Sequence, residues 1–126
     1  MSMVTTTEEY YMNIALATSM RSKDPHRKVG VILVRDDQII STGYNGTPRG
    51  FFNDMKDSHG NTLPTVIHAE ENAIIHAARS GVSTVGATAY STTFPCTHCA
   101  SLLAQAGVTK VYYRDDFKCN KGAIIF

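Results

Sequence analysis

The sequence has no uninterrupted hydrophobic run of the length needed to span a bilayer, which is about 18 residues, so no membrane role is expected. The first twenty residues, MSMVTTTEEYYMNIALATSM, lack the basic start and continuous apolar stretch of a secretory signal. We therefore expect a cytoplasmic location, where cysteines stay reduced. The sequence has only three cysteines, an odd number, so a metal or redox role is considered before a disulfide.

The sequence also lacks an excess of charge of either sign. Twelve Lys and Arg residues stand against eleven Asp and Glu residues, which gives a formal net charge of +1. A partner with a long phosphate backbone favours a strongly basic protein, so long nucleic acid is not expected as a partner. The local basic stretch MRSKDPHRK at residues 20–28 is nevertheless sufficient for a few phosphate groups. The charge pattern therefore favours a small phosphorylated ligand.

No repeat, low-complexity tract or linker divides the 126 residues, which predicts a single domain over residues 1–126. Apolar spacing, capping residues and β-branched runs predict alternating helices and strands. Helices are expected at residues 8–20, 68–79 and 96–107, and strands at residues 29–34, 38–44, 87–92 and 108–114. A strand, helix and strand in succession imply parallel pairing through a right-handed crossover. The tail 115–126 could add a strand or begin a helix, and both alternatives stay open.

Between the second strand and the second helix, residues 45–64 show no periodicity and contain three glycines and two prolines. Long loops inside compact domains are usually functional, so this loop is expected near the ligand.

Two short motifs contain the residues with the strongest chemical signal. HAE at residues 68–70 and PCTHC at residues 95–99 are expected at helix starts, where partial positive charge favours thiolates. His68, Cys96 and Cys99 supply three zinc ligands and leave a fourth position for water, as in a catalytic zinc site. Zinc lowers the pKa of bound water to about 7, and Glu70 is expected to move its proton. HxE with a distant PCxxC is the signature of zinc-dependent deaminases.

Two other roles for the cysteines remain as alternatives. Cys119 could close a structural site with three cysteines and one histidine, although this would leave Glu70 and the glycine-rich loop without a role. A redox CxxC pair is less consistent with the strand and proline before Cys96. No metal role is assigned to the remaining histidines, which are His26, His59, His76 and His98. One zinc ion per chain is predicted.

Two further stretches, SKDPHRKVG at residues 22–30 and GYNGTPRG at residues 43–50, complete a broader pattern. Together with HAE and PCTHC they resemble the deoxycytidylate (dCMP) deaminase family of the cytidine deaminase superfamily, in particular its short phage-type members. The resemblance implies an α/β fold with three α/β/α layers and a mixed central sheet. It also implies zinc-dependent hydrolysis of dCMP to dUMP and ammonia, which supplies dUMP for thymidylate synthesis, and assembly as a homohexamer.

The same resemblance assigns site residues. It implies His68, Cys96 and Cys99 as zinc ligands, Glu70 as proton shuttle and Asn45 near the deoxyribose. The guanidinium group matches phosphate geometry, so the candidates for the substrate phosphate are basic residues and one hydroxyl. These candidates are Arg21, Ser22 and Arg114, with Lys23, Arg27 and Arg49 as further choices.

Allosteric control is also implied by the resemblance, with dCTP as activator and dTTP as inhibitor and a magnesium ion at the triphosphate. The regulatory candidates are Lys23, Asp24, Arg27, Gly43, Asn45, Gly46, Arg49, Glu71 and Asn72. Gly43 and Gly46 are expected to permit tight or left-handed turns through which backbone N–H groups approach a ligand, with a plain turn as the alternative.

Two rival functions remain open. The chain could deaminate another substrate, such as free cytidine, dCTP or an adenosine in tRNA, although tRNA would favour a more basic surface. It could also be a non-enzymatic, zinc-stabilised module that binds nucleotides. The substitution Glu70→Gln separates an enzyme from such a module, because only an enzyme would lose ammonia release.

Overall fold

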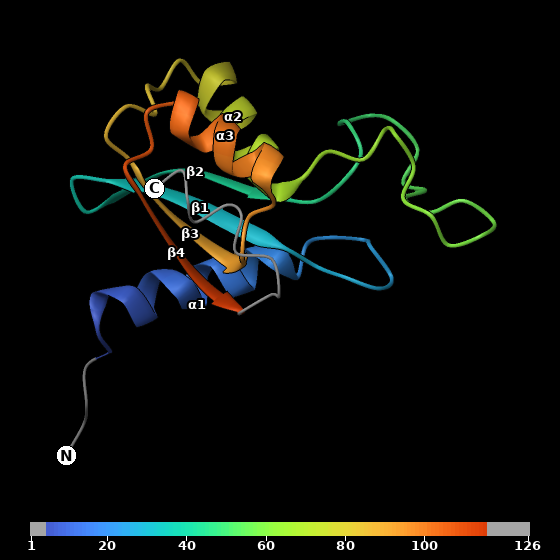
Figure 1. Cartoon of the computed structure of the whole chain (residues 1–126), viewed down its shortest axis with the longest axis horizontal. Helices are drawn as coiled ribbons and strands as arrows, with labels where there is room; N and C mark the ends of the chain where they lie inside the picture. The colour runs from blue at the N-terminus through green and yellow to red at the C-terminus, as the bar shows by residue number, and fades with distance from the viewer. Residues whose placement is uncertain (1–4, 116–126) are drawn as a thin grey trace.

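Four strands form one mixed sheet with helices on both faces (Figure 1). The computed structural model describes residues 5–115. In chain order the elements are α1 (Thr7–Ser19), β1 (Gly30–Arg35), β2 (Gln38–Tyr44), α2 (Ala69–Arg79), β3 (Thr88–Thr93), α3 (Thr97–Gln105) and β4 (Lys110–Asp115). The strand order is β2-β1-β3-β4, with β1 antiparallel to both neighbours and β3 parallel to β4. Helices α2 and α3 cover one face and α1 the other, which confirms the predicted α/β/α fold.

Local signals place the first elements within a residue of their predicted bounds. The Thr6 hydroxyl accepts a hydrogen bond from the Glu9 amide at 3.1 Å, and the Thr6 amide donates to the Glu9 carboxylate at 3.0 Å. This capping box starts α1. Asp36 and Asp37 have φ values of 52° and 58°, and two left-handed residues in succession make the tight turn of the β1–β2 hairpin.

The two faces of β1 supply two separate apolar clusters. Val31 and Leu33 pack with α2 and α3, whereas Ile32 and Val34 pack with α1. All four side chains are buried because helices cover both sides of the sheet. Since side chains alternate along a strand, a one-residue shift of β1 would exchange the two clusters, and this fixes its register.

Gly43 is required because α2 lies directly on β2. A Cβ atom at Gly43 would lie 2.4 Å from the Ala69 carbonyl oxygen and 2.4 Å from the Ala73 nitrogen. The predicted role of Gly43 and Gly46 in left-handed turns is wrong, since the positive-φ glycines of residues 5–115 are others. The Gly46 N–H is also engaged, because it donates to the Ile67 carbonyl at 3.0 Å. Close helix packing and chain pairing therefore explain these two glycines.

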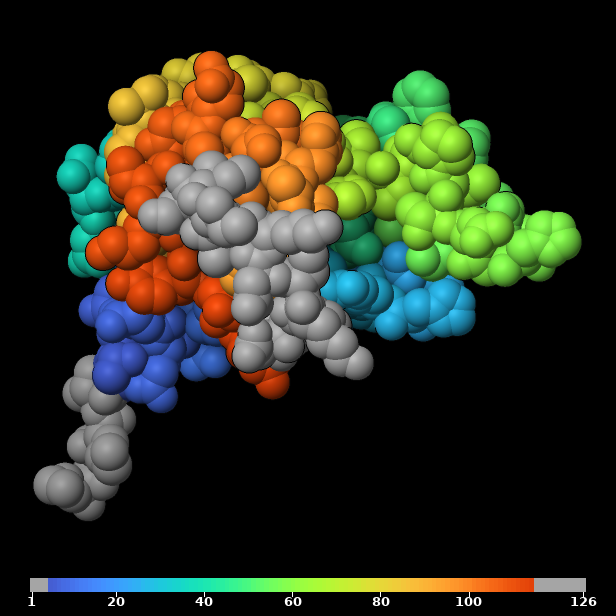
Figure 2. Space-filling view, viewed as in Figure 1, coloured from blue at the N-terminus to red at the C-terminus, as the bar shows by residue number. Residues whose placement is uncertain are grey.

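The predicted long loop is present as a segment that we call the arm, residues 45–67. It projects beyond the sheet and lies beside the 22–29 loop (Figures 1 and 2). Gly46 and Ile67 exchange two backbone hydrogen bonds of 3.0 and 2.8 Å, which close the base of the arm. Further out, Lys56 and Thr62 form an isolated bridge. The closed base brings His68, the residue after Ile67, back to the end of β2.

Some predictions fall outside the described residues. The tail beyond β4, with Cys119, is among them, so the structural four-ligand site stays an untested alternative. The single domain over residues 1–126 also stays a prediction. Between residues 5 and 115, no helix has the length and apolar character needed to cross a membrane.

Candidate active site

The starts of α2 and α3 meet beside the carboxyl ends of β2 and β3. His68 is the residue before α2, and Cys96 is the residue before α3. In open α/β sheets, ligands bind outside the carboxyl ends of the strands. Helix N-termini there also present partial positive charge, which stabilises thiolates. The fold therefore places both predicted motifs where a site is expected.

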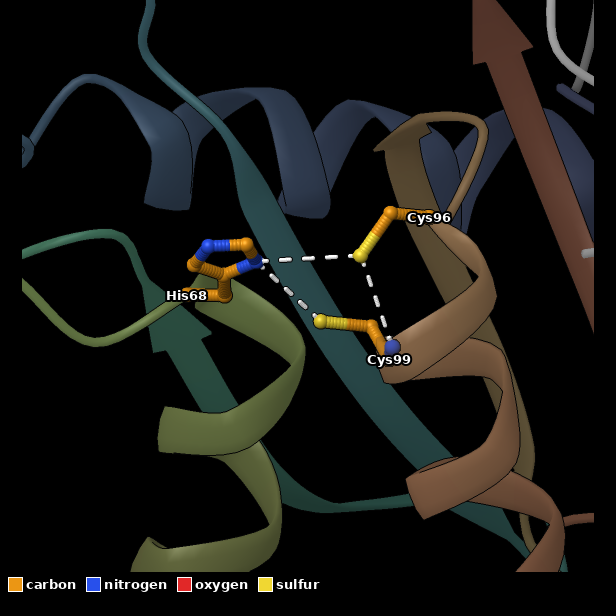
Figure 3. Close-up of side chains that lie close together, drawn as sticks. All are labelled: His68, Cys96 and Cys99. Carbon is orange, nitrogen blue, oxygen red and sulfur yellow. Dashed lines mark hydrogen bonds between the residues drawn. The ribbon is translucent and has the colours of Figure 1, made fainter. Parts of the chain in front are cut away.

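His68, Cys96 and Cys99 converge on one point (Figure 3). The His68 Nδ1 atom lies 3.2 Å from the Cys99 sulfur and 3.9 Å from the Cys96 sulfur, and all three donor atoms lie within 4.8 Å of one another. Zinc–sulfur bonds of about 2.3 Å and zinc–nitrogen bonds of about 2.0 Å in a tetrahedron put the donor atoms about 3.5 to 3.8 Å apart. The three side chains therefore have the spacing and the chemistry to hold a zinc ion.

The Cys99 thiol is buried beside a carboxylate and is protonated without a metal. Burial, followed by the nearby Glu70 carboxylate, raises the pKa of the fully buried Cys99 thiol. A divalent cation reverses this effect, because a coordinating thiol is deprotonated outright. The Cys99 amide also donates to the Cys96 sulfur at 3.4 Å, so the start of α3 helps to hold this ligand.

Glu71 links the two ligand-bearing turns. The His68 amide donates to Glu71 Oε1 at 2.9 Å, and Glu71 Oε2 lies 3.6 Å from His98 Nε2. The His98 side chain is 69% exposed, consistent with its prediction as a non-ligand. Glu71 was a regulatory candidate by resemblance, and in the structure it caps α2 next to the metal ligands.

Glu70 is a buried carboxyl group in the first turn of α2. It is 5% exposed and lines the same cavity as His68 and Cys96. Desolvation raises the pKa of Glu70 above its ordinary value. Because a general acid–base group works best with a pKa near the working pH, this environment suits proton transfer.

The cavity beside the ligands, which we call the metal cavity, has a volume of about 270 Å³. The residues that line it and were predicted from the sequence as site residues are Asp24, Arg27, Asn45, His68, Glu70 and Cys96. Sequence reasoning missed Lys56 and Thr62 of the arm, and it also missed Phe94, which follows β3. The Phe94 ring meets Tyr113 edge-on with centroids 4.5 Å apart, so β4 supports this wall of the cavity.

Asn45 joins the two stretches that carry the family resemblance. Its side-chain oxygen accepts from the Val29 amide at 2.9 Å, and its side-chain nitrogen donates to the Arg27 carbonyl at 3.0 Å. The Ser22 hydroxyl donates to the Asn45 carbonyl at 2.9 Å. Asn45 thus fixes the 22–29 loop to the base of the arm, and its contact with a deoxyribose stays a prediction.

Asp24 is a buried anion in the 22–29 loop. Its Oδ1 accepts from the amides of His26 at 2.8 Å and Arg27 at 3.0 Å, and its Oδ2 lies 3.5 Å from Lys56 Nζ. Burial acts to raise the pKa of Asp24, but these hydrogen bonds and the lysine charge lower it below its ordinary value. Asp24 therefore stays ionised and ties the arm to the loop.

Of the residues predicted for the phosphate, only Arg27 lines the metal cavity. Arg21 lines a different cavity, and the Ser22 side chain is buried with its hydroxyl already donating to Asn45. Arg114 is exposed on β4. Alternation along β4 puts it on the same face as Tyr112, which packs on the α1 side of the sheet.

The second cavity, which we call the cationic cavity, has a volume of about 570 Å³. Its basic residues are Arg21, Lys23, Arg49 and Arg79. Other regulatory candidates that line it are Asn45, Gly46 and Asn72. The other predicted regulatory residues lie elsewhere. Asp24 and Arg27 line the metal cavity. Gly43 lies beneath α2, and Glu71 caps that helix.

A three-layer fold with one histidine and two cysteines at paired helix starts, beside a buried glutamate, defines the class of zinc-dependent nucleobase deaminases. Within this class, the family model for the cytidine and deoxycytidylate deaminase zinc-binding region matches residues 5–115. The chain belongs to the cytidine and deoxycytidylate deaminase family.

Known proteins resemble the chain over most of its length. It is 41% identical over 112 residues to a "Probable deoxycytidylate deaminase" of Caenorhabditis elegans and 37% identical over 116 residues to the deoxycytidylate deaminase of Pongo abelii. These matches cover 84% and 86% of the chain but 56% and 64% of the two relatives. The chain therefore spans less than two thirds of their length.

One solved structure matches the chain over a larger share of both sequences than these two relatives do. It is the crystal structure of dCMP deaminase from the cyanophage S-TIM5 in complex with dCMP and dUMP, with a TM-score of 0.91 and 39% identity. The match covers 98% of this chain and 92% of the cyanophage chain.

Proposed function

We propose that the protein catalyses the zinc-dependent hydrolysis of dCMP to dUMP and ammonia, and so supplies dUMP for thymidylate synthesis. The observation that carries this proposal is the convergence of His68, Cys96 and Cys99 within 4.8 Å on a cavity that Glu70 also lines. The similarity to the cyanophage dCMP deaminase supports dCMP as the substrate.

The three metal ligands, Glu70 and Phe94 have separate roles in this proposal. A zinc ion held by His68, Cys96 and Cys99 would supply a Lewis acid that makes water nucleophilic near neutral pH. Glu70 takes one proton from the attacking water and passes it to the ring nitrogen. It then takes the second proton, from the hydroxyl group added to the ring carbon, and passes it to the amine, so that ammonia leaves as the carbonyl of dUMP forms. Phe94 supplies an apolar wall for a planar base and keeps bulk water from the reacting atoms.

A spectrophotometric assay of the purified protein tests the proposal against its rivals. We expect dCMP to be converted to dUMP, with slower turnover of deoxycytidine and none of an RNA hairpin that carries the tRNA wobble adenosine. Faster turnover of free cytidine, dCTP or the hairpin would identify a different deaminase. Binding of nucleotides without ammonia release would favour the non-enzymatic module.

We further propose that the cationic cavity is the regulatory site for dCTP and dTTP. Four basic residues around one cavity of about 570 Å³ suit a triphosphate, because Arg and Lys side chains make charge-assisted bonds to phosphate. No carboxylate is among the described residues that line it, so the magnesium ion would be held by the triphosphate itself. A dCMP saturation curve that neither nucleotide shifts would contradict this role.

The proposed deaminase is also expected to form a homohexamer and to be located in the cytoplasm. Phe51, Phe52 and Ile75 are 63%, 56% and 43% exposed, and Phe51 and Ile75 line the cationic cavity. Apolar side chains of this size on a surface are suited to contact between subunits. Light scattering should give six times the chain mass of 13.8 kDa, and a monomer would contradict the assembly.

A further inference from the structure

We infer that Lys56 recognises the phosphate of the substrate in the metal cavity, an inference that rests on the proposed deamination of dCMP. Lys56 lines this cavity together with His68, Glu70 and Cys96. It belongs to the arm, whereas the metal ligands belong to the starts of α2 and α3. One cavity thus combines a metal-binding donor set with a cation from a separate segment.

Contacts within the arm and to the 22–29 loop hold the Lys56 ammonium group at the cavity. Lys56 Nζ donates to the Thr62 hydroxyl at 2.7 Å, and the two residues also form a backbone bridge. Nζ lies 3.5 Å from Asp24 Oδ2, and the Lys56 side chain is only 19% exposed. Lysine side chains usually keep the ammonium group in water, so this degree of cover distinguishes Lys56 from a solvated surface lysine.

The ammonium group retains capacity to bind a ligand. It carries three N–H bonds, and within residues 5–115 Thr62 and Asp24 account for two of them. A phosphate monoester carries a charge of about −1.5 to −2 at pH 7. Hydrogen bonds between ionised partners are about twice as strong as neutral ones, so the third N–H is suited to a phosphate oxygen.

Asp24 does not oppose a phosphate here, because donors already surround its carboxylate. Two backbone amides donate to Oδ1, and Lys56 faces Oδ2. Arg27 also lines the cavity and adds a second positive charge. Asp24 therefore orients Lys56, and these donors compensate its charge.

Of the basic residues chosen from the sequence, Arg27 alone lines the metal cavity. Arg21 and Lys23 line the cationic cavity, and Arg114 lies on the α1 face of the sheet. Among the residues that line the metal cavity, Lys56 and Arg27 carry the permanent positive charges. Phosphate recognition therefore involves Lys56 of the arm, and Arg27 of the 22–29 loop is the other permanent cation of this cavity.

A nucleotide and its nucleoside test this inference, because they differ only in the phosphate. We would measure kcat/KM for dCMP and deoxycytidine with wild-type protein, Lys56→Gln and Lys110→Gln. Lys110 is the control, because it is exposed at the start of β4 and lines neither cavity. We expect Lys56→Gln to lower the ratio of dCMP to deoxycytidine kcat/KM about 10- to 100-fold, as for a lost hydrogen bond between charged groups. Lys110→Gln should leave the ratio unchanged.

Two more variants separate recognition from folding. A purely structural role for Lys56 would lower both kcat/KM values together and keep their ratio. Thr62→Val keeps the lysine charge but removes a hydroxyl that positions it, and Thr62 is exposed, so the fold should be retained. We expect a smaller fall in the same ratio for Thr62→Val and near wild-type behaviour for Lys56→Arg.

Equilibrium binding of dUMP and deoxyuridine gives a measurement without turnover. Wild-type protein should prefer dUMP, and Lys56→Gln should lose most of that preference. An unchanged ratio in Lys56→Gln, an equal fall in Lys110→Gln, or a wild-type protein without a preference for dUMP overturns the inference. If the wild type deaminates neither substrate but Lys56→Gln still loses the dUMP preference, the proposed function fails and the Lys56 assignment stands.

Discussion

The metal cavity and the cationic cavity share α2 and Asn45 but differ in the groups that line them. The smaller cavity, of about 270 Å³, is lined by two of the three metal-binding residues, two carboxyl groups and two permanent cations. The larger cavity, of about 570 Å³, contains four permanent cations, and no carboxyl group is among its described lining residues. Mixed, buried groups suit proton transfer, whereas positive charge alone suits anion binding. Helix α2 therefore borders two cavities of different chemical character.

The largest expected effect is that of Glu70→Gln, which should impair the metal cavity and leave the cationic cavity unaffected. Glu70→Gln should lower kcat for dCMP about 100- to 10,000-fold, the usual contribution of a general acid–base group. The zinc content should stay at the wild-type value, because the three ligands are untouched. Nucleotide binding in the cationic cavity should also be retained. Deamination at the wild-type rate would show that Glu70 is not the proton shuttle.

The second prediction concerns the strand beneath the shared helix. Gly43→Ala should lower the free energy of unfolding by about 1–3 kcal/mol, because the new methyl group meets the backbone of α2. Gly46→Ala is the matched control, since the nearest atom to its Cβ would be 3.7 Å away. Because α2 begins beside His68, Gly43→Ala should also weaken zinc binding. Chemical denaturation and zinc titration check both expectations, and equal stability of the two variants would contradict them.

The third prediction addresses the cationic cavity alone. The double substitution Arg49→Gln with Arg79→Gln should weaken dCTP and dTTP binding about tenfold or more, because charge-assisted contacts are lost. Calorimetric titration with each triphosphate measures the change, with Lys110→Gln as the control. Unaltered binding in the double variant would mean that the triphosphate does not bind in this cavity.

The smallest expected effect is a pH dependence at Asp24. Its pKa lies below the ordinary value of 3.8 in the folded state, so ionised Asp24 stabilises the fold above that pH. The stabilisation is lost as the pH falls through the folded pKa. Asp24→Asn should therefore be less stable than wild type at pH 7, by about 1 kcal/mol. The difference should shrink below a pH of about 4 in zinc-free samples, and a constant difference would contradict this account.

The sequence allowed the layers, the elements and the metal-binding residues to be predicted. HAE and PCTHC specify the donor set directly, because few residue types bind zinc and their positions at helix starts follow from the flanking patterns. The bounds of the helices and strands were predicted to within about two residues, since capping residues and apolar spacing act locally.

The lining of the cavities could not be predicted in the same way. Lys56 reaches the metal cavity from the arm, which has no periodicity that would orient its side chains. Phe94 directly precedes the PCTHC motif, so its position next to Cys96 was a sequence signal that could have identified it. The alternation of β4 that turns Arg114 away becomes evident only once the strand register is known. The role of Gly43 could not be predicted either, because it depends on how closely α2 packs on β2 in the folded protein.

The most direct test of the central claim combines zinc analysis with activity on the same samples. Protein stripped by a chelator should convert no dCMP, and activity should return in proportion to added zinc until one ion is bound per chain. Cys96→Ser should bind zinc weakly and remain inactive, whereas Cys119→Ser should behave as wild type. Full activity without zinc, or loss of zinc in Cys119→Ser, would contradict a catalytic ion held by His68, Cys96 and Cys99.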